Sequence, residues 1–215
     1  MSELRRHIAI TAIALLGFSV VGAALLSGTF ELTHSAIEDS ERAAKQVLIA
    51  QTLPAGSYDN ERVRDARTLA ADALLGLKRP GLYYPASRHG ETTAVVLEAI
   101  APDGYSGEIK LLVGIHADGR IAGVRVVAHR ETPGLGDYIE IAKNPWIRQF
   151  EGKSLSNPAA DNWRVKKDGG RFDYLAGATI TPRAVVKAVR NALDYFDRHQ
   201  SELLAAAAKE TQNVR

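Results

Sequence analysis

The chain has 215 residues, of which 46% are hydrophobic, and its 27 basic and 25 acidic residues give a formal net charge of +2. This length can form one domain with a sizeable core plus an additional segment, and the interspersed charges argue against nucleic-acid binding. There are no cysteines, which excludes disulfides, thiolate-ligated iron–sulfur clusters and a cysteine nucleophile.

The first element is an apolar run of 19 uncharged residues, Ile8–Leu26. A helix needs about 20 residues to cross the hydrocarbon core, so the run predicts a single membrane helix after a short N-terminus of residues 1–7. A cleaved signal peptide is the alternative, although the run is longer than usual and no small-residue cleavage site closes it. Arg5 and Arg6 precede the run and acidic residues follow it. The positive-inside rule therefore predicts a cytoplasmic N-terminus in a bacterial inner membrane and a periplasmic main domain.

Residues 27–90 are predicted to form a juxtamembrane helical segment. Apolar residues at helical spacing predict one helix over 35–52, which Pro54 ends, and a second over about 60–77. Prolines and a glycine within 80–85 predict an irregular connection after the second helix.

A β pattern begins after residue 91. Runs rich in β-branched residues predict strands at 94–97, 108–115 and 121–127, and Asp118-Gly119 is a strong hairpin signal between the last two. A meander is the simplest arrangement of these strands. The sequence Gly-Tyr-Ser-Gly-Glu-Ile at 104–109 predicts a turn before that hairpin.

The next segment, 129–136, reads His-Arg-Glu-Thr-Pro-Gly-Leu-Gly. Its two glycines allow backbone amides to approach a ligand, whereas the alternative is a plain connection with a proline turn. His129 and Glu131 have no third ligand at zinc-like spacing, so no metal site is predicted. A short helix is expected over 139–150, with Trp146 either in the core or covering a ligand.

Lys166 and Lys167 can offer positive charge to a phosphate, or belong to an exposed turn with Asp168-Gly169-Gly170. Thr181 is a good N-cap and Pro182 suits the first helical position, so a helix is expected to begin there. Its packed face consists of apolar residues at three- and four-residue spacing: Val185, Val186, Val189, Ala192, Leu193 and Phe196.

The start of this last helix is a favourable place for a phosphate, because free N–H groups and the positive dipole end face the preceding loop. Gly177 and Ala178 leave room for a bulky group beside the backbone. An ordinary loop and N-cap is the alternative interpretation of the same residues.

Three motifs together resemble a known family. Asp-x-x-x-Gly-Ala-Thr at 173–179, the 129–136 loop and the 104–109 turn are similar to the FMN-binding domain shared by two proteins: the G subunit of the Rnf electron-transport complex and the C subunit of the sodium-pumping NADH:quinone reductase. The resemblance covers nearly the whole chain and is closer to the Rnf protein. It implies an α+β fold with an antiparallel sheet and flanking helices over 91–200, followed by a helical tail at 201–215.

The resemblance also implies a cofactor and its site. In that family FMN is joined by a phosphoester to the threonine that corresponds to Thr179, and a separate flavin transferase attaches it from FAD with Mg²⁺, releasing AMP. Asp173 matches the motif aspartate, with a role in transferase recognition or in positioning Thr179. The other residues expected at the cofactor are Gly177, Ala178, Thr181, Glu131, Thr132, Gly134, Leu135 and Gly136.

The function implied by the resemblance is electron transfer within a membrane complex that couples ferredoxin and NAD chemistry to ion translocation. The partners would be the other subunits and the transferase, and no stand-alone catalysis is expected. The quinone-reductase protein is the sister alternative. A flavin-free membrane-anchored assembly module is an alternative of another class, whose sequence hint is Ala176 where the family usually has Ser or Thr.

Overall fold

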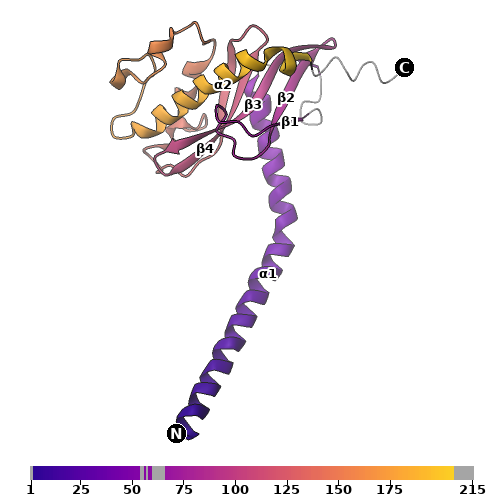
Figure 1. Cartoon of the computed structure of the whole chain (residues 1–215), viewed down its shortest axis with the longest axis vertical. Coiled ribbons are helices and arrows are strands. Elements are labelled where there is room, and N and C mark those ends of the chain that lie inside the picture. The colour runs from indigo at the N-terminus through magenta and orange to yellow at the C-terminus, as the bar shows by residue number, and fades with distance from the viewer. Residues whose placement is uncertain (1, 54–55, 57, 60–65, 206–215) are drawn as a thin grey trace, which may run out of the picture. The chain divides into compact units, whose positions relative to one another are not determined.

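A computed structural model describes residues 2–53, 56, 58–59 and 66–205 (Figure 1). The chain divides into two compact units, Met1–Lys45 and Gln46–Arg215. Helix α1, Ser2–Thr52, supplies the described residues of the first unit and the first residues of the second.

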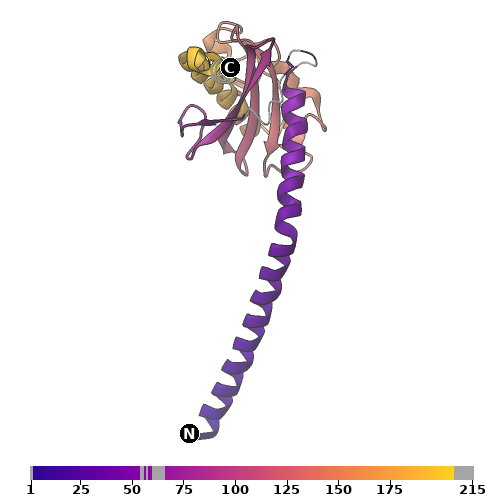
Figure 2. The same cartoon turned by 90° about the vertical axis from the view of Figure 1, so that its right-hand side faces the viewer.

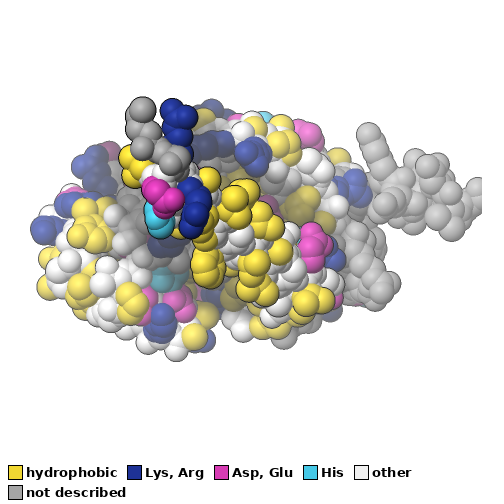
Figure 3. Space-filling view, turned by 90° about the horizontal axis from the view of Figure 1, so that it is seen from below, with side chains coloured by type: hydrophobic (Ala, Val, Ile, Leu, Met, Phe, Trp, Pro, Cys, Tyr) yellow, Lys and Arg dark blue, Asp and Glu magenta, His cyan; other side chains and the backbone are white. Residues whose placement is uncertain are grey.

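The part of α1 in the first unit is long and apolar enough to cross a membrane. Its large hydrophobic side chains are exposed, as a lipid environment requires; Phe18, for example, is 79% exposed. Figure 3 looks along this helix from its N-terminal end and shows the hydrophobic side chains gathered behind the charged side chains of the first turns. The predicted helix over 35–52 is also continuous with α1.

The second unit is built on a five-stranded sheet. Its strands are β1 (Arg67–Leu69), β2 (Gly81–Arg88), β3 (Glu91–Gly104), β4 (Gly107–His116) and β5 (Ile121–Ala128). Each strand pairs antiparallel with the next in chain order, so the predicted meander is confirmed. The predicted hairpin turn joins β4 to β5, with Gly119 at a φ of 82°.

The predicted helix over 60–77 is wrong for the residues that the structure describes, 66–77, and residues 60–65 lie outside them. Strand β1 and a turn occupy this stretch, and their leucines fill the core, which produced the helical spacing. Gly76 has a φ of 66°, and a Cβ there would lie 2.3 Å from the Ile100 carbonyl oxygen. The positive φ and the short distance to Ile100 both require glycine at position 76, and the chain forms a turn there instead of the expected helix.

The irregular connection predicted over 80–85 is also wrong, because these residues lead into β2. Tyr83 and Tyr84 are buried, on opposite faces of the strand. Among the described residues, β1 pairs with Gly81–Tyr83 of β2, and Pro85 lies opposite Val95 of β3.

The two faces of the sheet are covered by different helices. Helix α2, Ile180–Ala205, packs on one face, and its predicted apolar residues are all buried there. Ile49 in the last turn of α1 and Leu53 directly after the helix pack on the other face beside Val96 and Leu112. Figure 2 shows α2 and the last turns of α1 on opposite sides of the strands.

The last turn of α1 touches the sheet backbone at two glycines. A Cβ at Gly123 would lie 2.6 Å from the Thr52 carbonyl oxygen, and one at Gly114 would lie 2.9 Å from the same atom. Both strands therefore need glycine at the point where the helix approaches them most closely.

Gly123→Ala is accordingly expected to lower the free energy of unfolding of the second unit by about 1–3 kcal/mol, the usual cost of overpacking. Chemical denaturation followed by circular dichroism would measure the change. Lys110→Ala, at an exposed position on β4, is the control and should change stability little. Equal stability of the two variants would contradict the close contact with Thr52.

Between β5 and α2 the chain forms short 3₁₀ helices at Asp137–Ile139, Pro145–Phe150, Ala160–Asn162 and Lys166–Asp168. The single helix predicted over 139–150 is therefore divided into separate turns. Trp146 is a packing residue: it is 9% exposed, meets Tyr138 edge-on, and donates its ring N–H to the Asp173 carbonyl at 2.7 Å.

Candidate functional site

Three loops that are distant in sequence meet at one carboxylate. Glu131, 4% exposed, accepts the backbone N–H of Ser106 on Oε1 at 3.0 Å and the hydroxyl of Thr181 on Oε2. Ser106 belongs to the β3–β4 turn and Thr181 to the first turn of α2. Glu131 therefore joins the 104–109 turn and the 129–136 loop to the start of α2, two residues after the 173–179 motif. We call Ser106, Glu131 and Thr181 the Glu131 junction.

Two glycines make room for this carboxylate. A Cβ at Gly104 would lie 2.9 Å from Glu131 Oε1, and one at Gly136 would lie 2.8 Å from Oε2. A larger residue at either position would displace the carboxylate and break its hydrogen bonds.

Thr181 is not the N-cap that the sequence predicted. Helix α2 begins one residue earlier, at Ile180, and the Thr181 hydroxyl is buried and donates to Glu131. The Thr181 hydroxyl is thus bound to the distant carboxylate of Glu131 instead of capping the N-terminus of the helix. The first helical hydrogen bond runs from the Arg183 N–H to the Thr179 carbonyl at 3.4 Å, which places Thr179 at the N-terminal boundary of α2.

The loop after β5 is held by a chain of polar contacts. His129 Nδ1 accepts the Glu131 N–H at 3.0 Å, so its Nε2 carries the proton and donates to Glu140 at 2.6 Å. Lys143 binds both Glu140 (2.8 Å) and Asp137 (2.9 Å). Asp137 in turn accepts the Gly134 N–H at 2.8 Å, which fixes the turn before Leu135.

Lys143 also sets the charge of the two carboxyl groups. Its hydrogen bond is the main cause of the lowered pKa of Asp137. At Glu140 burial raises the pKa, but hydrogen bonds from Lys143 and His129 outweigh it, so the pKa is lowered overall. Both groups are therefore ionised at neutral pH and hold the loop as anions.

This charge state predicts an acid-sensitive loop. A carboxyl group whose pKa is lowered by folding stabilises the fold above its unfolded pKa, about 3.9 for Asp, and loses that effect as the pH falls through its folded value. The amide resonance of Gly134 is therefore expected to shift below about pH 4. Asp137→Asn should remove this titration. A Gly134 resonance that does not move as the pH is lowered until the protein unfolds, or that moves equally in Asp137→Asn, would contradict the link.

Thr179 follows a tight turn. Ala178 donates its N–H to the Leu175 carbonyl at 3.1 Å, and Gly177 has a φ of 89°, which suits the third position of such a turn. Thr179 is half-buried, and within the described part of the chain its hydroxyl has no hydrogen-bond partner. It lies beside the unbonded N–H groups that begin α2.

Exposed apolar side chains surround this region, and sequence reasoning missed most of them. Tyr105 is 67% exposed, Leu135 47% and Ile180 46%, and Tyr174 and Leu175 are also exposed. The first three directly adjoin Ser106, Gly136 and Thr181, which meet at or beside Glu131. The signal available in the sequence was a large apolar residue at a turn, where polar residues are usual. We call these five residues the apolar rim.

Asp173 lies apart from the Glu131 junction. Its carboxylate is exposed and forms an ion pair with Lys166, and its backbone N–H donates to Gln149 at 2.7 Å. Arg183 of α2 forms an ion pair with Asp168, in which the Arg183 Nε–H donates to Asp168 Oδ2 at 2.6 Å. Lys166, one of the two lysines that could offer charge to a phosphate, is thus paired with the motif aspartate Asp173.

Thr132 is another predicted site residue. Its backbone carbonyl accepts the N–H groups of Leu135 (3.1 Å) and Gly136 (3.0 Å) and so closes the turn in the loop. Thr132, Gly134 and Leu135 form the exposed part of that loop. Glu131 and Thr181 bind each other and support the loops from within. The described residues contain no group of three or more potential metal ligands.

Comparisons with known proteins agree with this architecture. Residues 104–194 match the FMN-binding domain family, and residues 1–52 match the RnfG N-terminal region. The G subunit of the ion-translocating oxidoreductase complex of Pseudomonas aeruginosa strain UCBPP-PA14 is 52% identical over 201 residues, covering 94% of each chain. The chain belongs to the family of G subunits of this complex.

Other G subunits of this complex are also similar to the chain. The G subunits of Vibrio cholerae serotype O1 strain ATCC 39541 and of Pseudoalteromonas atlantica are 45% and 42% identical, each covering more than four fifths of both chains. The predicted resemblance to the Rnf G subunit is thereby confirmed. The prediction that the chain contains an FMN-binding domain is confirmed as well. The matched range, 104–194, contains the Glu131 junction, Thr179 and the apolar rim.

Proposed function

We propose that this protein is a membrane-anchored electron-transfer subunit that carries FMN on Thr179 through a phosphoester bond. The observation that carries the proposal is the position of the Thr179 hydroxyl. It has no partner among the described residues, stands at the start of α2 after a small-residue turn, and lies in an FMN-binding domain.

The residues around Thr179 fit an FMN group. The N-terminal end of α2 favours the phosphate, and Gly177 and Ala178 leave space beside it. The apolar rim offers surface for an isoalloxazine ring, and burial of such side chains is favourable at roughly 25 cal/mol per Å². Bound FMN supplies one- and two-electron redox chemistry, and the chain provides its attachment and surroundings.

Attachment requires a second protein. A threonine hydroxyl is a weak nucleophile without an adjacent base, and no described carboxylate or imidazole hydrogen-bonds to that of Thr179. We therefore assign the step to a flavin transferase that uses FAD and Mg²⁺ and releases AMP, with Asp173 serving in recognition or in positioning Thr179. The threonine replaces AMP on the flavin phosphate and its proton leaves to solvent.

The cellular setting follows from α1 and the family. Arg5 and Arg6 before the apolar run favour a cytoplasmic N-terminus, a single membrane pass and a periplasmic FMN-binding domain. The curated relatives are named as subunits of an ion-translocating oxidoreductase complex, so we infer that the chain works with other subunits. It would relay electrons between ferredoxin and NAD chemistry in such a complex, without turnover of its own.

Peptide mass spectrometry tests the proposal. The full chain is produced with a flavin transferase, denatured, and digested, and the peptide containing Thr179 is analysed. The expected result is a phospho-linked FMN on that peptide. An unmodified peptide from transferase-positive cells would reject the covalent site and favour the flavin-free assembly module.

A further inference from the structure

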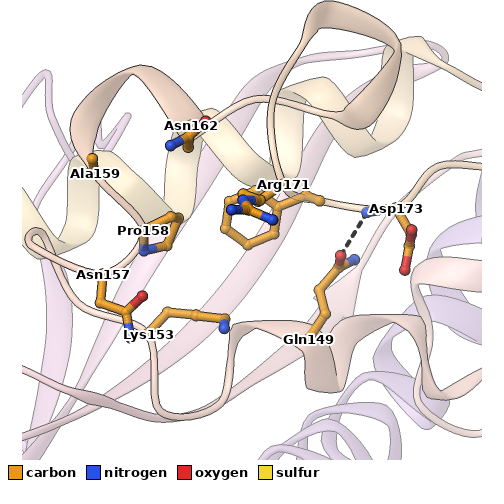
Figure 4. Close-up of a pocket in the computed structure, with 9 residues that line it drawn as sticks. Gln149, Lys153, Asn157, Pro158, Ala159, Asn162, Arg171 and Asp173 are labelled. Atoms are coloured by element: carbon orange, nitrogen blue, oxygen red, sulfur yellow. Dashed lines mark hydrogen bonds between the residues drawn. The ribbon is translucent and has the colours of Figure 1, made fainter.

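A cavity lies beside Asp173, and its lining includes none of the other predicted cofactor residues. Its volume is about 530 Å³, within the usual range for small-molecule sites. Figure 4 shows the residues that line it, which come from the loops between Pro145 and Asp173. They are Gln149, Lys153, Asn157, Pro158, Ala159, Asn162, Arg171, Phe172 and Asp173.

The cavity carries unbalanced positive charge. Lys153 and Arg171 reach into it from opposite sides (Figure 4). Neither has a carboxylate partner within the ranges that the structure describes. The acidic residue of the lining, Asp173, is engaged with Lys166, which is not part of the lining.

A neutral buried donor lies beside these two charges. Gln149 accepts the Asp173 N–H on Oε1, and its Nε2 is buried without a partner among the described residues. An unsatisfied buried donor is costly, so such a group indicates a missing acceptor. Phe172, Pro158 and Ala159 supply an apolar wall beside these polar groups.

We propose that this cavity binds a small phosphate ester, with the phosphate between Lys153 and Arg171. An arginine fork and an ammonium group are the usual partners of phosphate oxygens. The amide N–H groups of Gln149 and Asn162 are the additional donors, and the apolar wall accommodates the organic part. The inference does not depend on a flavin at Thr179, because the cavity contains neither Thr179 nor any residue of the apolar rim.

The two tryptophans of the chain give a direct readout. The Trp163 ring lies tilted against that of Phe172, with 4.9 Å between the ring centroids, and Trp146 donates to the Asp173 carbonyl, so each contacts a residue of the lining. The full chain in detergent, as Thr179→Ala to avoid quenching by flavin, is titrated with AMP while tryptophan fluorescence is recorded. A saturable change is expected, and inorganic phosphate should compete with it.

Arg171→Gln and Lys153→Gln are each expected to weaken AMP binding at least about tenfold, since each removes a charge-assisted contact. Lys110→Gln, at an exposed position outside the cavity, is the matched control and should bind as the parent does. Arg171→Lys keeps the charge and should bind AMP with an affinity between those of the parent and of Arg171→Gln. This intermediate affinity would show that the weaker binding of Arg171→Gln is not caused by unfolding. The absence of saturable binding, or equal binding by Arg171→Gln and Lys110→Gln, would overturn the proposal.

Discussion

Thr179→Ala is expected to abolish covalent flavin entirely when the full chain is produced with a flavin transferase. The substitution removes the only atom proposed to carry the phosphoester and leaves the fold almost unchanged. The Thr179 hydroxyl makes no hydrogen bond with the described residues, so its loss leaves no buried group unsatisfied. In-gel flavin fluorescence after denaturation and peptide mass spectrometry both measure the result.

Two control variants accompany this experiment. Thr179→Ser keeps a hydroxyl at the same position and should still be modified, whereas Thr68→Ala removes an exposed threonine on β1 and should be modified fully. Electron transfer by the assembled complex should fail in Thr179→Ala and persist in Thr68→Ala. Covalent flavin that survives in Thr179→Ala would move the attachment to another residue.

Glu131→Ala has the largest expected effect on stability. It leaves the Ser106 N–H without an acceptor and opens a gap beneath Thr181, in a place where Glu131 is 4% exposed. The buried Thr181 hydroxyl left without its acceptor costs about 1–3 kcal/mol and the lost hydrogen bond of the exposed Ser106 about 1 kcal/mol, so the free energy of unfolding should fall by about 2–4 kcal/mol. Chemical denaturation of the detergent-solubilised chain would measure it.

Glu131→Gln separates the hydrogen-bond geometry from the charge. A glutamine can accept the Ser106 N–H with its oxygen and donate to the Thr181 hydroxyl with its amide, so the loss should be only about 1 kcal/mol. Glu91→Ala, at an exposed position on β3, is the control with an expected change within about 0.5 kcal/mol. If Glu131→Ala proved as stable as Glu91→Ala, the three loops would not depend on this carboxylate.

The sheet and α2 were predictable because their signals are local. Alternating or continuous apolar runs marked three strands, and a clear amphipathic pattern marked α2. The helix prediction over 60–77 was wrong for the described residues because apolar residues of β1 and the following turn fill the core. Their spacing resembles that of a helix, and periodicity alone does not distinguish a helix from such a strand and turn. Strand β2 was missed because Pro80, Gly81 and Pro85 suggested an irregular connection, whereas Gly81 and Pro85 both lie within the strand.

The candidate site was predictable as a set of motifs but not as an arrangement. The sequence indicated which loops matter, and it predicted Glu131 as a residue beside the cofactor. It did not indicate that Glu131 joins Ser106 and Thr181, because these contacts span 25 and 50 residues of sequence. Apart from Leu135, the members of the apolar rim escaped notice for the same reason: each is ordinary alone and becomes informative only beside the others.

The Glu131 junction also imposes an order of events on the making of the protein. A contact between residues 50 positions apart forms only after the sheet and α2 have come together, since long loops close late. The turn, the loop and the helix start that surround Thr179 are therefore assembled at the end of folding. A transferase that recognises this assembled surface would modify finished molecules and pass over nascent ones, so that flavin attachment would act as a test of correct folding.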